Sequence, residues 1–219
     1  MPSASALNRF KKSFGDAQNF IPATDNFEED TYRAHRCRFA LVYGVAAMDN
    51  YFTKKFTDNL TIFLKKEGIT TELEIKLGEA GIDTSFFLEL LQAGDFSTRK
   101  PTRPFKKIHS KIRQSLGKYT SQSTHKIDQL FKAYEITELS KHAIGKAKSD
   151  NLLRGIRKPG ERLEKIVQRR HQIVHANDRN MKGRYNKIEA QRTREDLRII
   201  EAFVKGAEAI INNRFKSLK

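Results

Sequence analysis

The chain has 219 residues, of which 38% are hydrophobic, including 15 Phe and 6 Tyr, so it can build a substantial core and is not disordered throughout. Its single cysteine, Cys37, excludes a disulfide framework and a multi-cysteine zinc site, and its longest uncharged run, the ten residues 39–48, is far shorter than the roughly 18 that span a bilayer. The net charge of +16 suggests a polyanionic partner, either nucleic acid or an anionic surface, although a basic solvated face can also serve solubility alone.

The first part of the chain predicts one long helix. Low proline content, long stretches with a 3.6-residue period and the absence of alternating apolar and polar runs predict an almost entirely helical chain. Residues 1–25 form an N-terminal extension without the apolar segment of a secretory signal, so we expect a soluble, cytoplasmic protein. A helix is expected over 27–66, with an apolar stripe of Phe39, Val42, Ala46, Phe52, Phe56, Leu60 and Phe63. Asp49 falls on that stripe, which predicts a carboxylate on the buried face.

Shorter helices are expected in the rest of the chain. They cover 71–77, 85–91, 105–116, 123–134 and 138–147, with a loop over 94–104, and residues 68–118 are expected to form a helical insert with a basic loop. Pro159 begins a helix that runs to His175, because proline is well tolerated in a first turn. A polar connection follows over 176–191, and a last helix is expected from Thr193, with the capping-box partner Asp196, to Phe215. These elements predict an all-α bundle of four or more main helices in one domain, 1–219.

The excess of positive over negative charge lies entirely in the second half of the chain. Residues 1–98 hold 11 basic and 14 acidic side chains, whereas 99–219 hold 31 basic and 12 acidic ones. The candidate RNA-binding side chains are Arg99, Lys100, Arg103, Lys106, Lys107, Lys111, Arg113, Arg169, Arg179, Lys182, Arg184 and Lys187. Phe105, Tyr119 and Tyr185 lie among them and could stack on bases, or belong to the core or surface. Contacts of this kind bind phosphates without reading sequence.

The helix expected over 159–175 carries the side chains best suited to chemistry. Arg170 lies within its apolar stripe, where a permanent cation is costly unless it is paired or faces a cleft. His171 and His175 are four residues apart, so they share a neighbouring face. Two histidines at this spacing are found in helical metalloproteases, but Gln172 stands where that motif requires a glutamate, so we expect no metal and no other cofactor.

Two interpretations of these residues remain open at this point. Metal-free phosphodiester cleavage needs a group that exchanges protons near neutral pH, which histidine supplies, and a permanent cation for the phosphate, which arginine supplies. Alternatively, His171 and His175 are ordinary residues of a helix C-terminus, favoured there by the helix dipole, and Arg170 forms an internal ion pair with Asp49.

The sequence Arg-His-Gln-Ile-Val-His over residues 170–175 resembles the Arg-x4–6-His motif of HEPN-domain proteins, in particular their RiboL-PSP and related ribonuclease groups. The resemblance is clearest over 123–215. It implies a helical bundle that pairs as a homodimer with a composite cleft, and a metal-independent endoribonuclease of toxin–antitoxin, phage-defence or RNA-processing systems. An antitoxin or regulatory protein would then be a further partner beside RNA.

The same resemblance implies roles for individual residues. Arg170 would stabilise the transition state, His175 would assist attack of the ribose 2′-OH or protonate the leaving oxygen, and His171 would orient the phosphate. Asp49 is the candidate for an acidic residue that many family members carry on an early helix, and the products would end in 2′,3′-cyclic phosphate and 5′-hydroxyl. The alternatives are a non-catalytic RNA- or partner-binding helical module and a regulatory partner of a nucleotidyltransferase.

Overall fold

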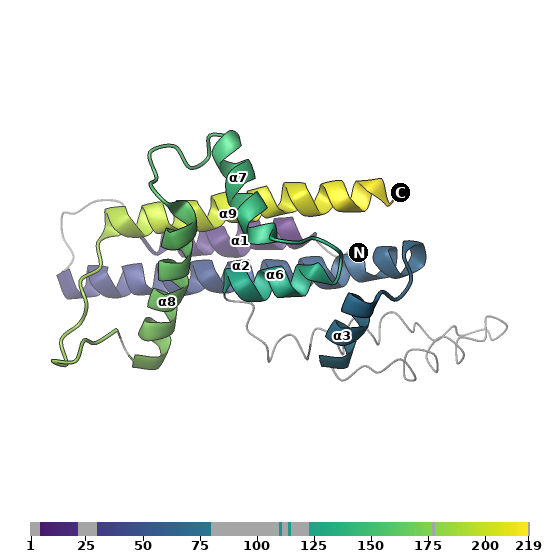
Figure 1. Ribbon diagram of the computed structural model, residues 1–219. Helices are drawn as coiled ribbons and strands as arrows, with labels where there is room; N and C mark the ends of the chain where they lie inside the picture. Colours follow the sequence, from purple (N-terminus) through teal and green to yellow (C-terminus); the bar gives the residue numbers. More distant parts are fainter. Residues whose placement is uncertain are drawn as a thin grey trace.

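The computed structural model describes residues 5–21, 30–79, 110, 114, 123–176 and 178–218. Its helices are α1 (Ala6–Asn19), α2 (Asp30–Lys66), α3 (Thr71–Glu79), α6 (Thr124–Lys132), α7 (Leu139–Ser149), α8 (Pro159–Ala176) and α9 (Ala190–Ser217) (Figure 1). The part of the chain described here contains no strand, only an isolated bridge between Arg179 and Tyr185. The predicted all-α class is therefore confirmed. Among the described helices, none has both the length and the hydrophobicity needed to cross a bilayer.

The two longest helices, α2 and α9, lie side by side and run in the same direction (Figure 1). The rings of Phe52 and Phe203 have centroids 5.4 Å apart, and further along the same two helices those of Phe63 and Phe215 are 6.4 Å apart. A residue further along α2 therefore contacts a residue further along α9, which shows that the two helices are parallel. Together α2 and α9 form the frame on which the other helices pack.

Helix α1 packs antiparallel to α2 and lies inside the segment that the sequence indicated as an extension. Phe10 contacts Tyr51, with ring centroids 5.9 Å apart, and Phe20 contacts Phe39 near the beginning of α2, at 6.2 Å. Ser5 caps the helix by accepting a hydrogen bond from the backbone of Asn8. The first 21 residues thus include part of the core.

The predicted stripe of α2 is right in its second half and wrong in its first. Phe52, Phe56, Leu60 and Phe63 are all fully buried, but Phe39 is 54% exposed, and Val42, Ala46 and Asp49 are only half-buried. The residues buried instead are Ala40, Leu41, Val45, Ala47 and Met48. Both sets repeat with helical spacing and both are apolar, so periodicity alone did not distinguish them. The contacts with α1 and α9 select the second set and leave Asp49 at the edge of the core.

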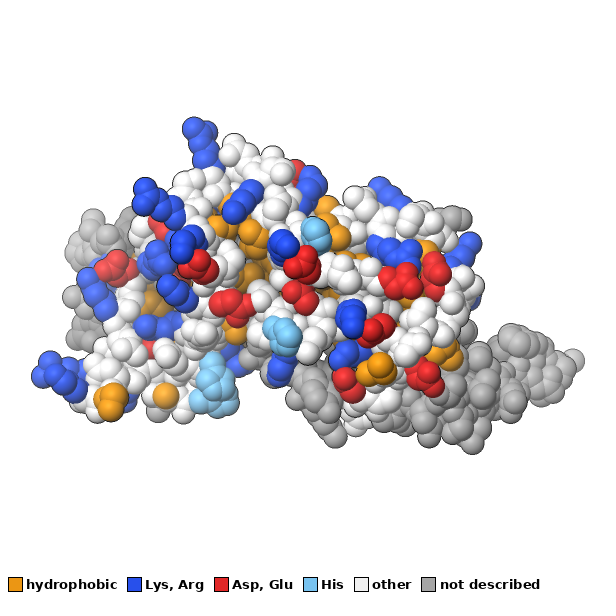
Figure 2. Space-filling model, viewed as in Figure 1, with side chains coloured by type: hydrophobic (Ala, Val, Ile, Leu, Met, Phe, Trp, Pro, Cys, Tyr) orange, Lys and Arg blue, Asp and Glu red, His pale blue; other side chains and the backbone are white. Residues whose placement is uncertain are grey.

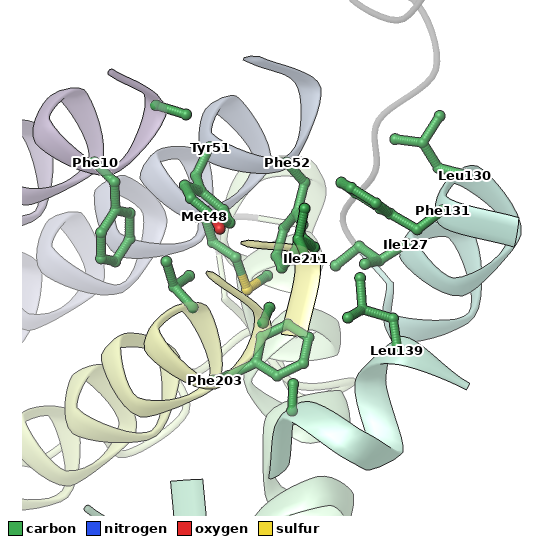
Figure 3. Close-up of a cluster of buried hydrophobic side chains, with 14 of the residues drawn as sticks. Phe10, Met48, Tyr51, Phe52, Ile127, Leu130, Phe131, Leu139, Phe203 and Ile211 are labelled. Atoms are coloured by element: carbon green, nitrogen blue, oxygen red, sulfur yellow. The ribbon is translucent and has the colours of Figure 1, made fainter. Parts of the chain in front are cut away.

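The centre of the core is formed by side chains from five helices (Figure 3). Its labelled members are Phe10 of α1, Met48, Tyr51 and Phe52 of α2, Ile127, Leu130 and Phe131 of α6, Leu139 of α7, and Phe203 and Ile211 of α9. Just after α6, the buried Tyr134 hydroxyl donates a 2.6 Å hydrogen bond to the carbonyl oxygen of Phe56. This buried hydroxyl group therefore has a hydrogen-bond partner.

Helices α7 and α9 approach each other at Gly206. A Cβ at this position would clash with the backbone carbonyl oxygen of Ala143. The facing surface of α7 is made of Leu139, Ala143 and Ala147, one residue in each turn. Small side chains on both helices therefore set the short distance between them.

The predicted helix boundaries agree with α3, α6, α7 and α8 to within a few residues. The start of α9 differs, because the helix begins at Ala190 and Thr193 lies within its first turn, where its hydroxyl donates to the carbonyl of Glu189. Asp196 makes no capping box and instead accepts a hydrogen bond from Arg162. The helices predicted over 85–91 and 105–116 lie outside the described residues, except that residues 110 and 114 are helical.

Candidate functional site

Helix α8 crosses the frame and carries the motif of residues 170–175 toward its C-terminal end (Figure 1). Near its beginning, the buried Arg162 forms ion pairs of 2.8 Å with both Glu195 and Asp196 of α9. Near its end, Ile173 and Val174 line a pocket of about 270 Å³ together with side chains of α2. One end of α8 is thus held by α9 and the other lies against the first half of α2.

The structure brings His171 and His175 together on the last turns of α8. Their ring centroids are 4.3 Å apart, and both side chains are exposed. Arg170 lies on the adjoining side of the helix and is half-buried, whereas Val174, directly before His175, is 45% exposed. The last two turns of α8 therefore carry two exposed imidazoles and one half-buried guanidinium.

The loop that follows His175 is folded as a short hairpin. The backbone N–H of Asn186 donates to the carbonyl oxygen of Asp178, and that of Asn180 donates to Arg184, at 2.9 and 2.8 Å. The tip turns at Gly183, whose φ of 73° is a left-handed conformation that glycine adopts without strain. A segment that looked like an irregular polar connection in the sequence is in fact hydrogen-bonded.

A buried carboxylate fastens this hairpin to two helices. Asp178 is fully buried and accepts hydrogen bonds from Arg38 of α2 at 2.7 Å and from Arg169 of α8 at 2.8 Å. The side-chain amide of Asn186 donates to its other oxygen at 3.1 Å. Arg38 and Arg169 also donate to the backbone carbonyl of Asn186. The position of the chain just after the histidine pair therefore depends on charges supplied by α2 and α8.

Tyr185 joins the hairpin to the same group of cations. The guanidinium groups of Arg38 and Arg179 both lie over its ring, 4.8 and 4.3 Å from the ring centroid. The edge-on ring of His35 is 5.2 Å away. Because Tyr185 is still 43% exposed, it remains partly accessible for a contact with a base, although its guanidinium neighbours already cover part of the ring.

The predicted basic residues fall into three groups. Arg169 forms an ion pair with Asp178 and therefore helps to hold the hairpin in place. Arg179, Lys182, Arg184 and Lys187 lie exposed on or beside the hairpin, where Arg179 donates to the carbonyl of Gly183. The candidates Arg99, Lys100, Arg103, Lys106, Lys107, Lys111 and Arg113 lie outside the described residues.

Sequence reasoning missed three residues of this site. His35 and Arg38 are on α2, and nothing in their local sequence indicates that they face a loop about 140 residues later. Asp178 had a usable signal, since it is the only acidic residue over 176–188 in a segment rich in Lys and Arg. Asp49, the fourth predicted catalytic residue, lies half-buried on α2, and its contact with Arg170 stays a prediction.

Comparison of the chain with protein-family models, with curated proteins and with solved structures gives no match. Within the described ranges, no three His, Cys, Asp or Glu side chains come together in a way that could hold a metal ion. The interpretation of the site therefore depends on the geometry of α8 and of the hairpin after it.

Proposed function

We propose that the protein is a metal-independent endoribonuclease of the HEPN type, with its active site at the C-terminal end of α8. The observation that carries the proposal is the exposed, packed pair of His171 and His175 on the same two helical turns as Arg170, followed by a hairpin held by ion pairs and rich in basic side chains. The grouping supplies a proton-exchanging group and a permanent cation within one helical turn and a half.

The reaction that fits these groups is an internal transesterification of RNA. The 2′-oxygen attacks the adjacent phosphorus while its proton is lost, the bond to the 5′-oxygen breaks, and that oxygen takes up a proton. His175 would exchange one of these protons, and Arg170 would offset the charge that builds on the phosphate oxygens. His171, whose ring packs against that of His175, would orient the phosphate.

Exposed basic residues of the hairpin support RNA as the substrate. Lys182 and Arg184 are exposed on the hairpin, and Lys187 is exposed just after it. Their charges would hold the phosphates that flank the scissile bond without reading base sequence. A toxin or anti-phage effector, controlled by an antitoxin and acting as a homodimer with a composite site, is the biological setting that the HEPN resemblance adds to this proposal.

The proposal is tested by incubating the purified protein with total RNA in EDTA. The wild type should cut RNA to fragments with 2′,3′-cyclic phosphate ends, and both Arg170→Ala and His175→Ala should abolish cleavage while RNA binding and the circular dichroism spectrum stay unchanged. His142→Ala, at an exposed position on α7, is the matched control and should cut like the wild type. Cleavage that survives both site substitutions would end the assignment.

The second candidate is a non-catalytic RNA-binding module that uses the same basic hairpin. It is favoured by the interactions that hold the basic hairpin: Arg169 pairs with Asp178, and Arg179 donates hydrogen bonds to Gly183 and Tyr185. A basic surface held in this way can bind RNA without cleaving it. Such a module would retain RNA in a salt-dependent manner and release no cyclic-phosphate ends in the experiment above.

A further inference from the structure

The packed pair of His171 and His175 has the spacing at which a helix can bind a metal ion through two side chains. Residues four apart lie on the same face of a helix, and the two imidazole rings have centroids 4.3 Å apart. Both side chains are exposed, and Figure 2 shows pale-blue histidine side chains at the lower edge of the molecule, where the C-terminal end of α8 lies in Figure 1. The ring nitrogens are therefore accessible to an ion in solution.

The distance between the two rings suits a shared zinc ion. Tetrahedral zinc binds histidine nitrogens at about 2.0–2.1 Å, which places two such nitrogens about 3.3 Å apart. Exposed imidazole rings rotate over a broad range about the bond to Cβ, so rings at 4.3 Å can each turn one nitrogen toward the same ion while the helix stays unchanged. Metalloprotease helices bind zinc with two histidines at this spacing. Gln172 replaces the catalytic glutamate of that motif but removes neither of the two metal ligands.

The contacts of the hairpin fix the turns of α8 that carry the pair. The backbone N–H of Asp178 donates to the carbonyl oxygen of Gln172 at 3.1 Å, which closes the C-terminal end of the helix. The side chain of Asp178 is in turn held by Arg38 and Arg169. His175 therefore lies on a turn that is anchored on both sides. Ligands on a rigid element lose little conformational freedom on binding, which favours the joint use of both imidazoles.

The surroundings of the pair select the kind of ion. Exposed Lys182 and Arg184 of the hairpin repel cations, whereas the carbonyl groups at the C-terminal end of α8 carry a partial negative charge. Mg²⁺ prefers oxygen ligands, whereas Zn²⁺, Cu²⁺ and Ni²⁺ bind well to imidazole nitrogens. Because coordinate bonds to nitrogen have to outweigh the repulsion from the hairpin, the pair favours these transition-metal ions over Mg²⁺.

We propose that His171 and His175 together bind one divalent transition-metal ion of the zinc type, and that the bound ion inhibits the proposed active site. One ring nitrogen of each histidine donates its lone pair to the ion and displaces one of its water molecules, and no bond of the protein breaks. Water completes the coordination, so the ion stays exchangeable. The binding of the ion does not rest on the proposed function. The inhibition does, because a ring nitrogen bound to the ion cannot take the proton of the 2′-hydroxyl.

Binding is measured on the full chain, at neutral pH, by competition for Zn²⁺ with a chromophoric chelator. The variant Gln168→His/His171→Gln keeps all six histidines but places the two on α8 seven residues apart, about 10.5 Å along the helix, which is too far for one ion. It should bind Zn²⁺ at least about tenfold more weakly than the wild type, because the second ligand no longer acts in the same site. The control His125→Ala/His142→Ala, at exposed positions on α6 and α7, should bind Zn²⁺ like the wild type. Circular dichroism verifies that all three proteins are folded.

Cleavage of total RNA is then followed in the same buffer with Zn²⁺, with Mg²⁺ and with EDTA. Zn²⁺ should stop cleavage by the wild type at the concentration that fills the site, EDTA should restore cleavage, and Mg²⁺ should leave it unchanged. Equal affinity of the wild type and Gln168→His/His171→Gln for Zn²⁺ would overturn the metal site, and cleavage that continues when the site is filled would overturn the inhibition. If the wild type cuts no RNA in EDTA, the proposed function fails, whereas the zinc titration still decides whether the site exists.

Discussion

Arg38 and Asp178 are 140 positions apart in the chain and form a buried ion pair, with 2.7 Å between the guanidinium Nε and a carboxylate oxygen. The pair connects α2 to the hairpin after the histidine pair, and Arg169 brings α8 to the same carboxylate. Asp178 also adopts a left-handed backbone conformation, with φ of 54°, which aspartate tolerates better than most residues. Its side chain and its backbone conformation therefore both determine the direction in which the chain leaves α8.

Replacing Asp178 with alanine should destabilise the fold markedly. The substitution leaves the guanidinium groups of Arg38 and Arg169 facing each other without their shared carboxylate, and removing one partner of a buried pair costs about 3–5 kcal/mol. Urea unfolding followed by circular dichroism measures the change. Glu189→Ala is the control, because the ion pair of Glu189 with Lys187 is exposed to solvent and should contribute little to stability. Equal, small effects of the two substitutions would contradict the anchoring role.

The two glycines that face or flank the α7–α9 contact should respond in opposite directions to alanine. Gly206→Ala places a methyl group against the carbonyl oxygen of Ala143, so overpacking should cost about 1–3 kcal/mol. Gly145 is exposed on α7 with open space around its Cβ position, and Gly145→Ala should stabilise the helix by about 0.5–1 kcal/mol. Thermal unfolding of the two variants beside the wild type measures both changes in stability. If both substitutions raised or both lowered the stability, the close contact between Gly206 and Ala143 would not explain the effect at Gly206.

The sequence predicted the parts of the fold that depend on local pattern. The four-residue spacing of Phe52, Phe56 and Leu60 marks a buried face whatever packs against it, and Pro159 marks a helix start. The spacing of Phe10, Phe14 and Ala17 carries the same kind of signal for α1, within the segment that the sequence indicated as an extension.

What the sequence did not predict depends on contacts between distant segments. Phe39 and Leu41 both lie on apolar, helix-periodic stripes, and only the packing of α1 and α9 against α2 decides that Leu41 is buried and Phe39 exposed. The candidate site shows the same division: the histidine pair follows from a local spacing of four, whereas Arg38 reaches the hairpin only through the crossing of α2 and α8. No local pattern encodes that meeting.

The α2–α9 interface should give stability a dependence on pH through Glu208. Burial by itself raises the pKa of Glu208, but hydrogen bonds from Lys55, Tyr51 and Asn212 outweigh it, so the pKa lies below its ordinary value of 4.5. A carboxyl group with a lowered pKa in the folded state stabilises the protein above pH 4.5, and this contribution is lost as pH falls through the folded-state pKa.

The measurement is the urea midpoint between pH 7 and pH 3 for the wild type and Glu208→Gln. The glutamine variant should be less stable at pH 7, and the difference between the two proteins should shrink as the pH falls. Glu201→Gln, at a half-buried position whose ion pair is with Lys205 on the same helix, should show a smaller pH-dependent difference. If the difference in stability between the wild type and Glu208→Gln stayed constant over this pH range, the role assigned to the Glu208 carboxylate would be contradicted.

The hairpin should set the salt dependence of RNA binding. Lys182 and Arg184 are exposed near its tip, whereas Arg179 in the same hairpin is committed to Gly183 and Tyr185. Each phosphate contact to single-stranded RNA adds about 0.7 to the slope of log K against log salt, so Lys182→Gln/Arg184→Gln should lower the magnitude of that slope by about 1.4. Fluorescence anisotropy with a labelled 2′-O-methyl RNA between 50 and 300 mM salt, a range chosen because screening changes strongly across it, gives the slope directly. The Lys141→Gln/Lys205→Gln variant removes the same charge elsewhere and should keep the wild-type slope, so an equal decrease in both proteins would mean that RNA responds to the overall charge and makes no local contact with the hairpin.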